Sequence, residues 1–105
     1  MSDDRYRITV DPEEKHAALM VLTRTLEIED TGPFELRCRE LLASNQPRLT
    51  VDLCGVDRVP STVISAIVKT HKEATEQGRS FTVCCRKVIA RILRQLLGES
   101  TEVLD

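Results

Sequence analysis

The stretch "VDLCGVDRVPSTVISAIVK", residues 51–69, changes from the pattern of a strand to the pattern of a helix partway along. It begins as an alternating apolar strand, breaks at Gly55, and continues after Pro60 with the spacing of an amphipathic helix. Two hydroxyl residues, Ser61 and Thr62, stand where the helix begins. A strand that hands over directly to a helix indicates an α/β architecture, and the hydroxyl pair marks the first place to look for function.

The same two periodicities predict the rest of the fold. Alternation favours strands over residues 5–10, 18–28, 48–54 and 80–85, with a turn at 11–16. Apolar residues at helical spacing favour helices over 33–44, 62–77 and 87–97. Residues 101–105 are consistent with a short final strand or with a frayed tail.

The faces of two predicted helices follow from their apolar residues. In helix 62–77 the inward residues are expected to be Ile64, Ile67, Val68, His71 and Ala74 or Thr75. Its outer side would carry Ser65, Lys69, Lys72, Glu73 and Glu76, with Val63 as an apolar point among them. Helix 87–97 is expected to pack through Val88, Ile89, Ile92, Leu93, Leu96 and Leu97.

The order β-β-α-β-α-β-α predicts an α/β fold in one domain spanning residues 1–105. We expect one mixed sheet of four to five strands with the helices packed mainly on one face. Strands 48–54 and 80–85 are joined through a helix, so they are expected to run parallel. A chain of 105 residues with 41% hydrophobic residues is long enough for one two-layer core.

Composition excludes several classes of function. Aromatic residues make up only 3% of the chain and the net charge is −2, which argues against nucleic-acid binding. The charged N-terminus has no apolar segment of the signal-peptide type, and no apolar run reaches the length of a membrane span. We therefore expect a cytoplasmic protein without membrane insertion. The bases concentrated in residues 69–94 form either a solvated helix face or a surface for a charge-matched partner.

The four cysteines give no zinc pattern along the sequence. Cys38, Cys54, Cys84 and Cys85 contain no C-x-x-C spacing, and neither His16 nor His71 completes a set of ligands with them. They are interpreted as reduced thiols of an intracellular protein, with no metal and no cofactor expected.

The region from 48 to 98 resembles the STAS domain of anti-sigma-factor antagonists. The family pattern runs through a strand, D-L-S-G-V, a turn with D-S-S-G or D-S-T-G, a helix, a glycine, a strand and a helix. Here Asp52-Leu53-Cys54-Gly55-Val56 matches the first block with Cys for Ser. Pro60-Ser61-Thr62-Val63 replaces the second, so the acid and the glycine are missing. The resemblance is loose over the N-terminal third.

The resemblance implies a regulatory module of bacterial transcription that binds an anti-sigma factor or a related serine kinase. Ser61 would be the first candidate phosphoacceptor and Thr62 the second. Partner contacts are expected through the turn 55–62 and helix 62–77, from Asp52, Asp57, Pro60, Val63, Ser65 and Lys69. The loss of the acid and the glycine favours the hypothesis of a constitutive or specialised binder over a simple phosphorylation switch.

Independently of any family, a hydroxyl before an apolar helical run is a natural N-cap, so Ser61 is expected to cap the helix. The unpaired amides and the dipole at a helix N-terminus also favour a phosphate there. Catalysis is not expected, because no base stands in a recognisable relation to Ser61 or to a cysteine. Two alternatives stay open: an accessory STAS subunit of a lipid or anion transport assembly, next to a transporter ATPase, and a nucleotide or small anion bound at the amides of 61–64.

Overall fold

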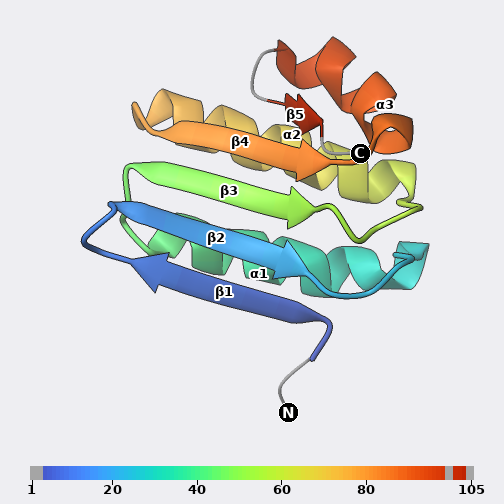
Figure 1. Ribbon diagram of the computed structural model, residues 1–105, viewed down its shortest axis with the longest axis horizontal. Helices are drawn as coiled ribbons and strands as arrows, with labels where there is room; N and C mark the ends of the chain where they lie inside the picture. Colours follow the sequence, from blue (N-terminus) through green and yellow to red (C-terminus); the bar gives the residue numbers. More distant parts are fainter. Residues whose placement is uncertain (1–3, 99–100, 104–105) are drawn as a thin grey trace.

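The computed structural model describes residues 4–98 and 101–103, and Figure 1 shows their arrangement. The elements, in chain order, are β1 (Tyr6–Asp11), β2 (His16–Val21), the 3-10 helix η1 (Ile28–Asp30), α1 (Thr31–Ala43), β3 (Arg48–Leu53), α2 (Ser61–Glu76), β4 (Ser80–Cys85), α3 (Lys87–Leu97) and β5 (Thr101–Val103). The predicted α/β class and the predicted order of elements are confirmed.

The strands form one mixed sheet of five, in the order β1-β2-β3-β4-β5. β1 and β2 are antiparallel, and every later pair is parallel, including β3 with β4 across the α2 crossover. Figure 1 shows α1 and α2 behind the sheet and α3 at the side of β4 and β5. Of the two alternatives left open for TEVLD, a short final strand or a frayed tail, the structure has the strand over 101–103, and residues 104–105 lie outside the described residues.

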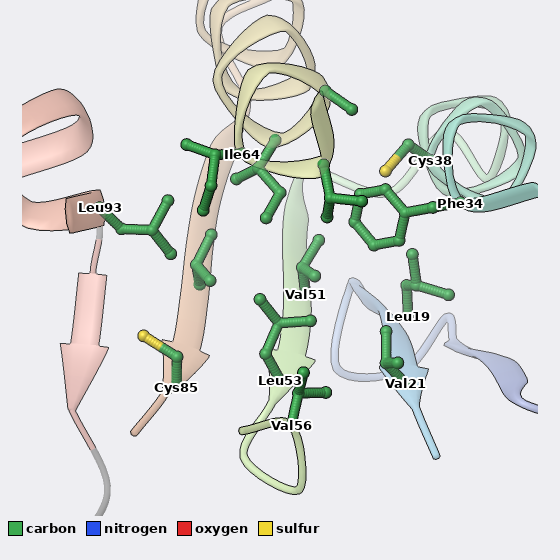
Figure 2. Close-up of a cluster of buried hydrophobic side chains, with 14 of the residues drawn as sticks. Leu19, Val21, Phe34, Cys38, Val51, Leu53, Val56, Ile64, Cys85 and Leu93 are labelled. Atoms are coloured by element: carbon green, nitrogen blue, oxygen red, sulfur yellow. The ribbon is translucent and has the colours of Figure 1, made fainter. Parts of the chain in front are cut away.

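The hydrophobic core lies between the sheet and the helices. In β3, Leu49, Val51 and Leu53 are buried while Thr50 and Asp52 are half-exposed, as the alternation of a one-sided strand requires. Figure 2 shows Phe34 of α1, Ile64 of α2 and Leu93 of α3 directed toward the sheet. The opposite face of the sheet is therefore the open one, and helices on mainly one face are confirmed.

The prediction of a strand over 18–28 is wrong in its second half. β2 already begins at His16, which pairs with Asp11 across a turn shorter than expected, and it ends at Val21. The chain then leaves β1, and Thr25 forms a parallel bridge with Arg58. Leu26, which supplied part of the apolar pattern, is buried beneath the turn that follows β3 instead of in the sheet.

The helix boundaries differ from the predictions by one or two residues at their starts. α1 begins at Thr31 rather than 33, and α2 begins at Ser61 rather than 62 and ends at Glu76. Gly78 has a φ of 72°, the left-handed conformation that was predicted to stop α2. No helix within residues 4–98 and 101–103 has both the length and the apolar character needed to cross a membrane.

Candidate functional site

The turn between β3 and α2, residues 54–60, is tied to the sheet at its first residues. The Asp52 carboxylate accepts a hydrogen bond from the Cys54 amide at 2.9 Å, which caps the end of the strand. The Val56 amide donates to the Leu53 carbonyl at 2.9 Å, and the Val56 side chain is fully buried. The turn therefore has an apolar anchor in Val56, and Val59 packs against the core beside it, while Arg58 is exposed.

Asp57 fixes the middle of this turn through two arginines. Its carboxylate accepts hydrogen bonds from Arg24 at 3.1 and 2.8 Å and from Arg86 at 2.8 Å. Hydrogen bonding to Arg24, with the charges of Arg24 and Arg86, holds the pKa of Asp57 below its ordinary value. Arg86 also donates to the Cys54 carbonyl at 2.9 Å. Asp57, which the sequence suggested as a partner contact, thus links the turn to the segment after β2 and to the start of α3.

Ser61 does not cap α2, so that prediction is wrong. The N-cap residue is Pro60, whose carbonyl accepts hydrogen bonds from the Val63 amide at 3.1 Å and the Ile64 amide at 3.2 Å. Ser61 instead occupies the first helical position with its side chain exposed. Pro60, in an extended conformation, is the last residue of the loop. The Ser61 hydroxyl, which the sequence predicted as the cap, therefore lies in the first turn of the helix.

The second hydroxyl, Thr62, is exposed but engaged. Its Oγ1 lies 2.7 Å from Oγ1 of Thr31, the first residue of α1. The N-termini of α1 and α2 therefore meet at this corner, where both candidate phosphoacceptors are exposed and the Thr62 hydroxyl is paired with Thr31.

Val63 was expected on the outer side of α2, and this is wrong. It is 0% exposed and belongs to the hydrophobic core, along with Ile67 and Ala74 further along the helix, and Thr70 is buried on the same side. The buried stripe is thus rotated by about one residue from the predicted one. His71, predicted on the inward side of the helix, is half-buried and packs edge-on against Phe81, with ring centroids 5.7 Å apart. It therefore lies at the edge of the core.

Ser65 and Lys69, two of the predicted partner-binding residues, line an open groove of about 350 Å³ between α2 and α3. Its other lining residues are Ile64, Val68, Lys72 and Leu96. The groove is mostly apolar at its floor and carries ammonium groups at its rim. A partner that fills it would need apolar side chains with acidic neighbours.

The predicted packing of α3 is wrong for half of its apolar residues. Ile89, Leu93 and Leu97 are buried as expected, but Val88, Ile92 and Leu96 are 63%, 50% and 53% exposed. They recur every four residues and form an apolar stripe on the outer side of α3. We call this stripe, together with the groove residues Ser65, Lys69 and Lys72, the α2–α3 surface.

The cysteines and histidines show no arrangement typical of a nucleophilic enzyme within the described part of the chain. Burial raises the pKa of Cys38 to about 12 and that of Cys85 to about 11, so both are protonated near neutral pH. His16 lies 2.8 Å from the Thr50 hydroxyl on the open face of the sheet, away from the turn. Asp52 also lies on that face, so the structure does not bring it to the outward side of the turn with Ser61.

Comparison with known proteins finds a match among solved structures but not among family models or curated sequences. No family model matches the chain, and no curated protein matches its sequence. Among solved structures, an anti-sigma factor antagonist from Mycobacterium paratuberculosis superimposes with a TM-score of 0.69 at 18% sequence identity. The match covers 92% of this chain and 81% of that chain. The chain therefore has the STAS-like fold of an anti-sigma factor antagonist, as the resemblance of its central region predicted.

Proposed function

We propose that this protein is a regulatory protein–protein interaction module of the anti-sigma-factor-antagonist type, acting in the bacterial cytoplasm. Its partner would be an anti-sigma factor or a related serine kinase, bound through the turn 55–62 and the outer side of α2. The observation that carries the proposal is the exposed start of α2 next to an open apolar groove, on the fold of an anti-sigma factor antagonist.

The α2–α3 surface extends this interface beyond the residues expected from the sequence. Three large aliphatic side chains spaced along one helix and exposed by half or more are unusual on a small domain that works alone. Lys69, Lys72 and the exposed Arg91 add positive charge around them. We infer that the partner presents an amphipathic segment whose apolar side chains are flanked by Asp or Glu.

Leu96→Asp is expected to weaken binding of the anti-sigma partner at least tenfold, about 1.4 kcal/mol, because it places a carboxylate in the groove. The measurement is isothermal titration of purified anti-sigma factors from the same organism. Leu36→Asp is the matched control, since Leu36 is similarly exposed but lies on α1. Equal affinities for the two variants would move the interface away from the α2–α3 surface.

Control by phosphorylation is proposed for Ser61. A phosphate there would add about 1.5 to 2 negative charges beside the first amides of α2 and within the partner interface. The Val63 amide already donates to the Pro60 carbonyl. The amides that precede it have no acceptor within the helix, so they face solvent at its N-terminal end. The missing acid at position 60 removes one polar neighbour, and Pro60 holds the turn extended in its place.

Ser61→Asp is expected to reduce partner affinity, whereas Ser61→Ala is expected to bind like the wild type, because only the first adds charge at the interface. Mass spectrometry after incubation with the partner kinase would locate any phosphate, and Thr62→Ala tests the second acceptor. A protein that binds tightly and carries no phosphate on either hydroxyl would instead be a constitutive binder.

The alternative partner is the ATPase of a lipid or anion transport assembly, for which the same α2–α3 surface would serve. Titration of both candidate partners against wild type and Leu96→Asp separates the two, because only the true partner shows an affinity that the variant lowers. We propose no catalytic activity, since the buried thiols remain protonated and the two histidines are engaged with Thr50 and Phe81.

A further inference from the structure

Three potential ligand groups meet on the open face of the sheet, at the carboxyl ends of β3 and β4. Asp52 and Cys84 are direct neighbours in the parallel register of these strands. Cys54 follows β3 by one residue, and its Sγ lies 3.3 Å from Sγ of Cys84. The two sulfurs and a carboxylate oxygen of Asp52 all lie within 4.8 Å of one another.

The position of the cluster separates it from the packed thiols of the core. Cys85 points into the hydrophobic core (Figure 2). Cys84 precedes it in β4, so it lies on the opposite face of the sheet, where it is 9% exposed. Asp52 and Cys54 are half-exposed, so the cluster can be reached from solvent. The nearby Arg86 donates hydrogen bonds to the Cys54 carbonyl at 2.9 Å and to Asp57 at 2.8 Å, so its guanidinium is paired with these two groups.

Two thiols and a carboxylate match the ligand preferences of zinc and related thiophilic divalent ions. Two thiolates bound to one tetrahedral Zn²⁺ at about 2.3 Å lie about 3.8 Å apart. The sulfur separation of 3.3 Å thus needs to open by only about half an ångström to accept the ion, which side-chain rotation can supply.

The Asp52 carboxylate places a negative charge beside the two sulfurs, and this charge attracts a divalent cation. A bound ion would stabilise both thiolates, so metal binding is expected to release their protons.

We propose that Asp52, Cys54 and Cys84 form a binding site for a thiophilic divalent cation of the zinc class. Each bound ion displaces one proton from each thiol to the buffer, and the three protein ligands leave a fourth position for water or for a partner side chain. The bound ion would cross-link the first residue of the β3–α2 turn to β4. It would thus stabilise the start of this turn, next to the proposed interface. The metal site does not depend on the proposed function being correct.

The test uses Cd²⁺ as a spectroscopic probe and Zn²⁺ as the stabilising ion, added to the reduced full-length chain. Cd²⁺ is expected to bind one per chain and to give the ultraviolet absorbance of thiolate-to-cadmium charge transfer. Saturating Zn²⁺ is expected to raise the melting temperature by at least about 5 °C. Zn²⁺ added to the cadmium form is expected to abolish the absorbance by competition.

Three variants identify the ligands and one serves as control. Cys54→Ser and Cys84→Ser should each abolish the absorbance and the melting shift, and Asp52→Asn should weaken binding at least tenfold. Cys85→Ala is the matched control, because it removes the adjacent thiol that faces the core, and it should retain full binding. Circular dichroism of each metal-free variant checks that it is folded.

Two results would overturn the assignment. One is a folded, reduced wild-type chain that shows neither charge-transfer absorbance nor a melting shift at micromolar free metal. The other is binding that persists in the Cys54→Ser/Cys84→Ser double variant, which would place the ion elsewhere.

Discussion

Val63→Asp is expected to unfold the domain rather than to disturb an interface. Val63 is 0% exposed and lies in the hydrophobic core between α2 and the sheet. An unpaired carboxylate in such a position costs several kcal/mol even after the structure relaxes. Because domains of this size are stable by only about 5 to 15 kcal/mol, this one substitution removes most or all of the stability.

The measurement is the urea unfolding midpoint followed by circular dichroism. Ser65→Asp is the matched control, because it places the same charge two residues along α2 on an exposed position, and its midpoint should equal that of the wild type within error. A cooperative transition of Val63→Asp at the wild-type midpoint would show that the start of α2 faces solvent, as the sequence pattern alone had suggested.

The parts of the fold that follow local periodicity were predictable. The alternation of Leu49, Val51 and Leu53 places β3 with its correct buried face, and Gly78 marks the end of α2. The crossover rule then gives the parallel pairing of β3 with β4. These features depend on residues close together in the sequence, so no tertiary information was needed.

The errors arose where a distant contact decides the outcome. Leu26 continues an apolar pattern, but the Leu26 amide donates to the Arg58 carbonyl, and this contact takes the chain out of β2. The stripe of α3 contains more apolar residues than its two neighbouring elements can cover, so Ile92 and its stripe remain exposed. Helical spacing identifies which residues are apolar, whereas the position of α2 and β5 beside α3 decides which of them are buried.

The sequence predicted the place of Ser61 in the fold but not the local geometry around it. Ser61 is exposed at the start of α2, as the phosphoacceptor hypothesis requires, yet the capping geometry belongs to Pro60. The convergence of Asp52, Cys54 and Cys84 was missed, because a search for metal ligands by spacing considers only residues near one another in sequence. The strand register that aligns Asp52 with Cys84 was the signal that would have revealed it.

Ile67→Ala is expected to lower the free energy of unfolding by about 2 to 5 kcal/mol, since it removes a fully buried side chain from the centre of α2. For a domain of this size the melting temperature should fall by roughly 10 to 25 °C. The loss has two parts: the apolar surface that is no longer buried, and the cavity that the close-packed neighbours only partly fill.

Ile92→Ala provides a control with the same chemical change, because Ile92 is 50% exposed on α3. Its effect is expected to stay within about 0.5 kcal/mol, since truncation of a half-exposed side chain leaves no cavity. Calorimetry of the two variants side by side therefore isolates burial as the cause. If both changed the melting temperature equally, the assignment of Ile67 to the core and of Ile92 to the exposed α2–α3 surface would be wrong, and the docking interface drawn from that exposure would be wrong with it.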